Sequence, residues 1–375
     1  MEVFQQFVIV FGVLAYLKIY DANNLVELKI FYSSEDELYI SNAHYDVKRD
    51  KLQTYGRKPK FSVVWNIPSD KCHSFGCFLN LSYYDIISNL NENFTGNSIN
   101  IFYNIGLFPY IDDNNQWFNG GLPQLGNLTH HLEIVKRDVE ETIPKRDFCG
   151  LGIIDQEKWR PIWERDWDRM EVYRSESRKL VRKEHPTWNP DDIEKEAKRQ
   201  FELSARAFME TTLQVITALR PWGSWGYYSF PDCYNHYPGQ RDCSEKVKEE
   251  NDRLSWLFEA SRALYPSIYL SHTGMSPDER ALYVYGHLSE TRRVMKSVKH
   301  KIRAYPYMRI FYRDYDREYC LTDLFNTMGQ AFKFKMDGVV VWEKQAAVLT
   351  KYGCFRLQHY VQQFLGPLAK YLSSL

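Results

Sequence analysis

From residue 61 to the end of the chain, short apolar segments alternate with longer segments of helical character. The expected strands are 61–67, 98–104, 150–155, 224–230, 267–270, 302–311 and 338–342. Several of them are almost continuously apolar, which is typical of parallel strands buried on both faces. Because no second zone of different composition interrupts the alternation, it predicts a single α/β domain, an irregular (β/α) TIM-like barrel of about seven parallel strands.

Two helices are predicted between the third and fourth of these strands. The first is a densely charged segment at 165–184, and the mixed signs of its charge run at 174–183 indicate a solvated outer face more than a polyanion-binding surface. The second follows Asn189, a residue type that favours the N-cap, and has Pro190 at its first helical position. We expect this second helix to end near Leu219.

The start of the chain differs from the rest. An apolar run at 7–17 has the length of a signal-peptide core, so residues 1–22 are predicted to be a signal peptide cleaved after Ala22. An uncleaved signal anchor is the alternative, because no Lys or Arg precedes the apolar run. Residues 23–60 are polar and are predicted to form an irregular N-terminal extension. The barrel is then assigned to 61–375.

Cysteines and glycosylation sequons bear on the compartment. The seven cysteines contain no Cys-x-x-Cys pair, so disulfides with one thiol left over are favoured over a zinc site. Three Asn-x-Ser/Thr sequons begin at Asn80, Asn93 and Asn127, and such sequons are used only in a secreted chain. Together with the apolar start, they predict a secreted protein. A lysosomal or signal-anchored protein is the alternative.

Net charge and aromatic content indicate which classes of molecule the protein could bind. The formal net charge is zero, so no global field attracts a polyanion, which argues against nucleic acid. An anionic polysaccharide would instead require a local basic lining. Aromatic residues make up 16% of the chain, which suits either stacking on sugar rings or a large core.

The third predicted strand ends in two carboxylates, Asp155 and Glu157. On an extended backbone, residues two apart leave the same face, with about 6.5 Å between their backbones. A shared pocket would raise the pKa of one carboxyl and leave the other ionised, as a glycosidase requires. Trp159 and Arg160 follow the pair. Arg160 could contact a substrate carboxylate or pair with a neighbouring acid.

Longer motifs around this pair resemble those of the hyaluronidase family of glycoside hydrolases, with the animal secreted and venom branch the most similar. The motifs run in the family's order and cover nearly all of the chain from about residue 61 to 370. They are 65–68 (WNIP), 119–128 (NGGLPQLGNL), 152–161 (GIIDQEKWRP), 183–186 (KEHP), 225–235 (WGYYSFPDCYN), 256–258 (WLF), 265–269 (YPSIY) and 338–342 (GVVVW).

The resemblance implies an irregular barrel that cleaves β-1,4 bonds after N-acetylhexosamine in hyaluronan and, in some members, in chondroitin. It makes Glu157 the proton donor, while the substrate's own acetamido oxygen acts as the nucleophile. Asp155 would then orient the acetamide and stabilise positive charge. Tyr228 and Tyr269 match the tyrosines that hold the acetamido group, and Trp342 matches the aromatic residue under the sugar. No metal or other cofactor is implied.

The resemblance also implies how cysteines pair. It implies the two disulfides Cys72–Cys354 and Cys233–Cys243. The remaining cysteines match no family bridge, and one option pairs Cys77 with Cys149 and leaves Cys320 free.

Two positions depart from the family pattern. His287 stands where members usually have Arg, and in the cleft it would give a weaker, pH-dependent cation. Glu343 replaces a Gly, and an acid at the rim would narrow the cleft or repel a uronate. These departures motivate an alternative function, a glycan-binding or venom-type protein with a barrel but little turnover.

Overall fold

The computed structural model describes residues 5–10, 13–20, 25–32, 45–46, 61–236 and 239–375. The chain divides into two compact units, Met1–Lys58 and Pro59–Leu375. The first contains an antiparallel sheet of β1 (Gln5–Val10), β2 (Val13–Tyr20), β3 (Leu25–Tyr32) and β4 (Tyr45–Asp46). Strands β3 and β4 lie within 23–60, where irregular backbone was expected. The cleavage point predicted after Ala22 lies outside the described residues, and the signal peptide remains a prediction.

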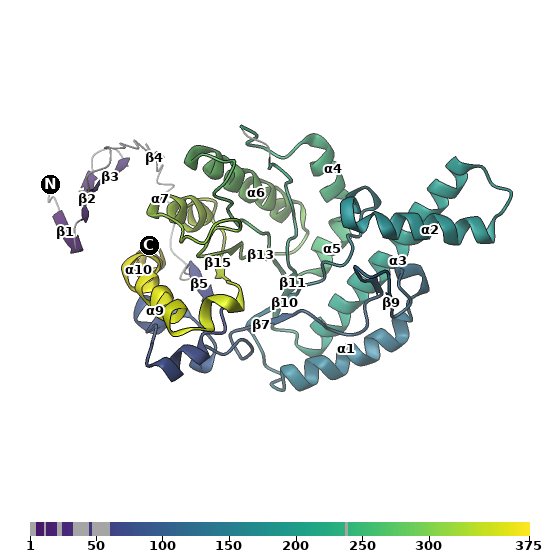
Figure 1. The fold of residues 1–375 in the computed structure, drawn as a ribbon, viewed down its shortest axis with the longest axis horizontal. Helices are drawn as coiled ribbons and strands as arrows, with labels where there is room; N and C mark the ends of the chain where they lie inside the picture. The colour runs from purple at the N-terminus through teal and green to yellow at the C-terminus, as the bar shows by residue number, and fades with distance from the viewer. Residues whose placement is uncertain (1–4, 11–12, 21–24, 33–44, 47–60, 237–238) are drawn as a thin grey trace. The chain divides into compact units, whose positions relative to one another are not determined.

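The second unit is the barrel, with parallel strands at its centre and helices around them (Figure 1). Its strands are β5 (Ser62–Trp65), β6 (Ile86–Ile87), β7 (Ile99–Phe102), β10 (Leu151–Ile154), β11 (Ser224–Tyr227), β12 (Ala263–Leu264), β13 (Arg303–Ala304), β14 (Tyr307–Met308) and β15 (Gly338–Val341). They pair in three parallel runs, β7-β10-β11, β12-β13 and β14-β15-β5-β6. Single bridges from Tyr228 to Tyr265 and from Ser267 to Tyr307 connect these runs.

An asparagine side chain spans the remaining gap, between β6 and β7. The Asn89 amide nitrogen donates to the Ile99 carbonyl at 2.8 Å, and the amide oxygen accepts from the Ser98 and Ile99 N–H groups at 2.9 and 3.2 Å. Asn89 is buried, and its amide therefore satisfies backbone groups that a longer β6 would have paired. The barrel is irregular here because β6 has only two residues.

Six of the seven predicted strands contain observed strand, and the fold class is confirmed. The prediction at 267–270 is wrong, because the strand lies earlier, at β12, and only the Ser267 bridge continues it. Pro266 has no N–H to donate to the ladder, which limits pairing at this point. The predicted strand 302–311 is divided into β13 and β14, again at a proline, Pro306.

The long helices are α1 (Leu128–Thr142), α2 (Glu171–Glu184), α3 (Pro190–Leu219), α4 (Glu245–Arg253), α6 (Pro277–Ser297), α9 (Lys351–Tyr360) and α10 (Gly366–Ser374). The predicted cap of α3 is confirmed, since Asn189 accepts a hydrogen bond from the Asp192 N–H at 2.9 Å. Helix α2 begins later than predicted, because short 3-10 turns occupy the preceding residues and Asp168 has a positive φ of 58°. Among the described residues, no helix is both long and apolar enough to cross a membrane.

Both disulfides implied by the resemblance are present in the barrel, Cys72–Cys354 and Cys233–Cys243. The option of a Cys77–Cys149 bridge is wrong, because Cys77, Cys149 and Cys320 are all free thiols. Cys77 is buried and donates a hydrogen bond to the Cys354 carbonyl at 3.2 Å, whereas Cys149 is exposed. Cys77 is thus buried beside the first disulfide, while Cys149 lies at the surface, and the two thiols are not bonded to each other.

Candidate active site

The predicted site residues follow the carboxyl ends of neighbouring parallel strands. Asp155 and Glu157 come directly after β10, Tyr228 after β11, and Trp342 after β15. Tyr269 lies on the segment that continues from β12. Because these ends share one edge of a parallel barrel, they bring together residues that are far apart in the sequence.

Asp155 is held at the end of β10, where its backbone N–H donates to the Phe102 carbonyl at 2.9 Å. Its Oδ1 atom is buried and has no hydrogen-bond partner among the described residues. Burial, with a smaller contribution from the negative charge of Glu157, raises the pKa of Asp155 to about 7. A carboxyl in this state holds a proton through the weakly acidic range.

Glu157 is exposed at the mouth of the site. Desolvation by surrounding groups raises its pKa, while the cations of Arg169, Arg160, Arg313 and Lys158, in decreasing order, oppose the rise. The sequence led us to expect one perturbed carboxyl and one ordinary one. Instead the pKa of each carboxyl is raised, mainly by burial, and the charge of Glu157 adds to the rise at Asp155.

The three predicted aromatic residues form one continuous wall. The Tyr269 and Trp342 rings are stacked, with centroids 5.8 Å apart and planes 13° apart, and the Tyr228 ring lies 6.1 Å from Tyr269. The Tyr228 hydroxyl donates to Ser267 Oγ at 3.2 Å. Sequence reasoning therefore named a set of side chains that the fold does bring together.

Tyr103 belongs to the same site and was missed. It directly follows β7, and its hydroxyl accepts a hydrogen bond from Trp342 Nε1 at 3.0 Å. Burial is the main cause that raises its pKa to about 12, with smaller contributions from Asp155 and Glu157, so its hydroxyl stays protonated. Its position at the carboxyl end of a predicted strand was the signal that could have found it.

Arg160 lies beside the carboxylate pair but is already engaged. Its Nη1 donates to the Arg165 carbonyl at 2.8 Å, and its guanidinium lies 5.1 Å from the centre of the Trp167 ring. Asp166 accepts from the Arg160 backbone N–H at 2.7 Å and not from the side chain. Among the described residues, no carboxylate lies within ion-pair distance of the Arg160 guanidinium, and its contact with a substrate carboxylate stays a prediction.

The expectation for Glu343 is wrong. Its side chain is only 2% exposed and is ion-paired with Arg309, and it also accepts from the Phe311 and Lys344 N–H groups at 3.1 and 2.9 Å. It therefore cannot act as a free acid at the rim. The Arg309 guanidinium in turn lies 5.8 Å from the Trp342 ring centre, so Glu343 supports the aromatic wall through Arg309.

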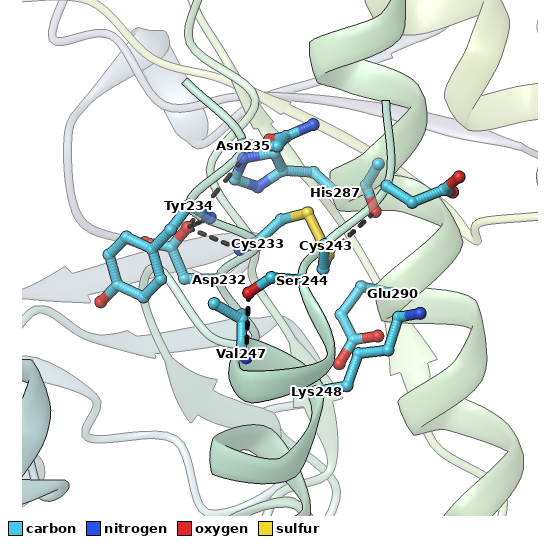
Figure 2. The surroundings of a disulfide bond; sticks show 12 residues. Asp232, Cys233, Tyr234, Asn235, Cys243, Ser244, Val247, Lys248, His287 and Glu290 are labelled. Atoms are coloured by element: carbon cyan, nitrogen blue, oxygen red, sulfur yellow. Dashed lines mark hydrogen bonds and ion pairs between the residues drawn. A yellow bond between two sulfur atoms is a disulfide. The ribbon is translucent and has the colours of Figure 1, made fainter. Parts of the chain in front are cut away.

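The expectation for His287 is also wrong. This residue lies on α6 beside the Cys233–Cys243 disulfide and is 2% exposed (Figure 2). Burial lowers its pKa to about 4, and its nearest acid, Asp232, is 4.0 Å away. His287 is consequently neutral at ordinary pH and supplies no cation to the cleft.

Three other cations lie near Glu157: Lys158, Arg169 and Arg313 are exposed, and each acts electrostatically on its carboxyl. Across residues 61–236 and 239–375, no carboxylate lies within ion-pair distance of any of them. A chain of zero net charge thus has a local basic lining at this site.

Comparisons with known proteins agree with this geometry. A family model described as hyaluronidase matches residues 51–374. A hyaluronidase of Polistes annularis is 38% identical over 84% of this chain and 88% of its own length, and mouse Hyaluronidase-1 is 38% identical over 82% and 68%. The structure of bee venom hyaluronidase in complex with a hyaluronic acid tetramer matches with a TM-score of 0.80 and 36% identity, over 84% of this chain and all of that one. The chain belongs to the hyaluronidase family of glycoside hydrolases.

Proposed function

We propose that this protein is a secreted endo-β-N-acetylhexosaminidase that hydrolyses the β-1,4 bonds of hyaluronan. The observation that carries the proposal is the position of Asp155 and Glu157 at the end of β10, where both charges act on Tyr228 of the wall that it forms with Tyr269 and Trp342. An acid pair beside stacked aromatic rings suits a pyranose, whose apolar face packs on rings while its glycosidic oxygen receives a proton. The bee venom relative holds a hyaluronic acid tetramer.

In the proposed mechanism, Glu157 donates its proton to the leaving oxygen and the acetamido oxygen of the sugar attacks its own C1. Asp155 accepts a hydrogen bond from the acetamide N–H and stabilises the positive charge that develops on that group. Both carboxyls come from one strand and approach the sugar from one side. This arrangement favours a nucleophile supplied by the substrate, because retaining glycosidases that use their own nucleophile place it on the opposite side of the sugar.

Binding of the sugar would redistribute the proton of the carboxyl pair. In the free site the pKa of Asp155 is about 7, so this residue competes with Glu157 for the proton. A hydrogen bond donated by the acetamide stabilises the ionised form of Asp155 and lowers its pKa. The proton is then held by Glu157, where the leaving oxygen requires it.

The aromatic wall would bind the N-acetylhexosamine on the non-reducing side of the scissile bond. Tyr228 and Tyr269 hold the acetamido group, and Trp342 lies under the ring. Arg160 remains a proposed contact for a substrate carboxylate through the guanidinium nitrogens that the Arg165 carbonyl leaves open. The low-turnover alternative has lost its basis, because the departures that motivated it, His287 and Glu343, are both buried.

The deciding experiment digests purified hyaluronan with the wild-type protein and with Glu157→Gln and Asp155→Asn. The wild type should release new reducing ends, and Glu157→Gln should reduce kcat by at least about 10²-fold, since it removes the proton donor without changing the side-chain shape. Equal product from the wild type and Glu157→Gln would overturn the mechanism. A wild type that binds oligosaccharides without releasing reducing ends would overturn the activity itself.

Chondroitin is the second candidate substrate, since its hexosamine also carries an acetamido group. Assays on hyaluronan and chondroitin sulfate at equal disaccharide concentration would compare the two values of kcat/KM. We propose hyaluronan as the better substrate, and a higher kcat/KM on chondroitin sulfate would reverse that order.

Secretion is proposed from the sulfur chemistry and the sequons. Two disulfides form in oxidising compartments, and Asn80, Asn93 and Asn127 are all exposed. Recovery of the protein from the medium of expressing cells, followed by sequencing of its first residue, tests both secretion and cleavage after Ala22.

A further inference from the structure

We propose that Lys158, together with the aromatic pair Tyr110 and Phe118, forms the subsite for the uronate that leaves when the bond is cut. This proposal rests on the proposed function. The subsite lies on the leaving-group side of Glu157 and binds the carboxylate of a hexuronic acid sugar.

Lys158 is an exposed cation without an acidic partner next to the proposed proton donor. Its Nζ atom lies 4.8 Å from the centre of the Tyr110 ring, and its backbone N–H donates to Gln156 Oε1 at 2.6 Å. Within the described part of the chain, no carboxylate is close enough to form an ion pair with it. Many surface cations of this protein are paired, including Lys179 and Lys198, so the ammonium of Lys158 is available to an anion in a way that theirs are not.

The aromatic partners of Lys158 sit on a short hairpin, β8 (Tyr110–Ile111) paired with β9 (Trp117–Phe118). The Tyr110 and Phe118 rings are stacked with centroids 4.6 Å apart and planes 8° apart, and Phe118 is 36% exposed. The buried Tyr173 hydroxyl lies 3.1 and 3.2 Å from the Ile111 nitrogen and oxygen, where it accepts from the N–H and donates to the carbonyl. This anchor fixes the hairpin, so Tyr110 carries both the Lys158 ammonium and the partly exposed Phe118 ring on a rigid support.

The chemistry of the scissile bond gives this cation its role. The oxygen that Glu157 must protonate is O4 of the next sugar, and in hyaluronan that sugar is a glucuronate. Its carboxylate is attached at C5, the ring carbon next to the one that carries the leaving oxygen. When Glu157 reaches that oxygen, the carboxylate must therefore lie close by, and the Lys158 ammonium, whose charge already acts on Glu157, is near enough to meet it.

A cation at this point also removes an electrostatic conflict. The incoming carboxylate would otherwise face Asp155 and Glu157 at short range, and like charges there disfavour binding. Lys158 supplies an opposite charge to the substrate, and the Phe118 ring supplies a flat apolar surface for the sugar. Together they make a binding site for an acidic sugar out of residues that the proposed catalytic steps do not use.

The test measures kcat/KM on hyaluronan at low salt, on the acid side of the pH–rate maximum, where Glu157 is already protonated. Lys158→Met should lower kcat/KM about tenfold, the lower end of the effect of losing one hydrogen bond to a charged group. Lys158→Glu should lower it further, and Lys158→Arg should keep it within about threefold because the positive charge remains. The kcat/KM of Lys158→Met should also depend less on salt concentration than that of the wild type.

Two control variants separate a subsite from a general loss of charge or packing. Lys351 also lies over an aromatic ring, that of Phe355, but on α9, which lies across the barrel strands from β9 (Figure 1). Lys351→Met removes the same charge and should leave kcat/KM within about twofold. Trp117 is 47% exposed on the opposite face of the hairpin from Phe118, so Phe118→Ala should raise KM and Trp117→Ala should not.

The outcomes are distinct. If the wild type releases no reducing ends from hyaluronan, the proposed function fails. If the wild type is active and Lys158→Met retains its full kcat/KM, the subsite is wrong. The subsite is also wrong if Lys158→Arg loses as much as Lys158→Met, or if Lys351→Met loses as much as Lys158→Met, because the effect would then not depend on a charge at this position.

Discussion

Arg309 and Glu343 form a buried ion pair beside the aromatic wall of the site. The side chains are 7% and 2% exposed, and the guanidinium lies 5.9 and 5.8 Å from the ring centres of Tyr269 and Trp342. The guanidinium therefore contacts both of the stacked rings at once. The departure of Glu343 from the family pattern is therefore explained: its side chain pairs with the arginine that supports the aromatic wall.

Removing one partner of this pair should destabilise the protein strongly. Glu343→Ala leaves Arg309 buried and unpaired, and we expect the free energy of unfolding to fall by about 3 kcal/mol. Chemical denaturation monitored by tryptophan fluorescence measures the change. The exposed pair of Arg206 and Glu210 is the control, and Glu210→Ala should cost at most about 1 kcal/mol. Equal effects of the two substitutions would contradict the supporting role of Glu343.

The pH dependence of hydrolysis follows from the carboxyl pair. Activity requires one proton on Glu157 and a negative charge on Asp155, so the pair must hold one proton of its two. Because the pKa of Asp155 is raised to about 7 and that of Glu157 is also raised, this proton is lost only as pH rises through the neutral range. We expect kcat/KM to fall tenfold per pH unit on the alkaline side. A rate that still climbs above neutral pH would contradict the role of Glu157.

Replacing Arg169 tests whether Glu157 is the proton donor, because the direction of the resulting pH shift can be predicted. Arg169 contributes the largest of the charges that lower the pKa of Glu157. Arg169→Gln removes that charge, so the pKa of Glu157 should rise and the alkaline limb of the kcat/KM profile should move to higher pH. A limb that stays in place or moves to lower pH would mean that Glu157 does not control it.

Glycosylation can be tested without disturbing the fold. All three sequon asparagines are exposed, and Asn127 also caps α1 by accepting from the His130 N–H at 3.0 Å. Thr129→Ala removes this sequon and leaves the cap intact, whereas Asn127→Ala removes both. We expect each variant to lose one glycan by mass spectrometry, and only Asn127→Ala to lose stability, by about 1 kcal/mol. A sequon that carries no glycan in the secreted protein would remove that position from the prediction.

The parts of the fold that depend on local pattern could be predicted from the sequence. The apolar strand before Asp155 and the cap at Asn189 both follow from spacing and residue type over a few positions. The aromatic wall required the family resemblance as well, because Tyr228 and Trp342 are more than 100 residues apart in the sequence and meet only when the barrel closes.

Other features depend on packing between distant segments. The burial of Glu343 depends on Arg309, 34 residues away in the sequence, and nothing beside Glu343 in the chain indicates that partner. The two-residue strand β6 is too short to give a pattern, and the role of Asn89 in joining it to β7 follows only from the closed barrel. A substituted residue near a site therefore cannot be assigned to the cleft from sequence alone.

The buried His287 should make the protein less stable in acid. Its pKa is about 4 in the folded protein because of burial, and it is near 6.5 in the unfolded chain, so the unfolded chain binds the proton more readily. The stability linked to neutral His287 is fully present above about pH 6.5 and is lost as the pH falls toward 4. His287→Gln cannot bind this proton, and its free energy of unfolding should fall less than that of the wild type between pH 7 and pH 5, as urea denaturation at both values would measure. A parallel loss in both proteins would mean that another group, and not His287, causes the acid sensitivity.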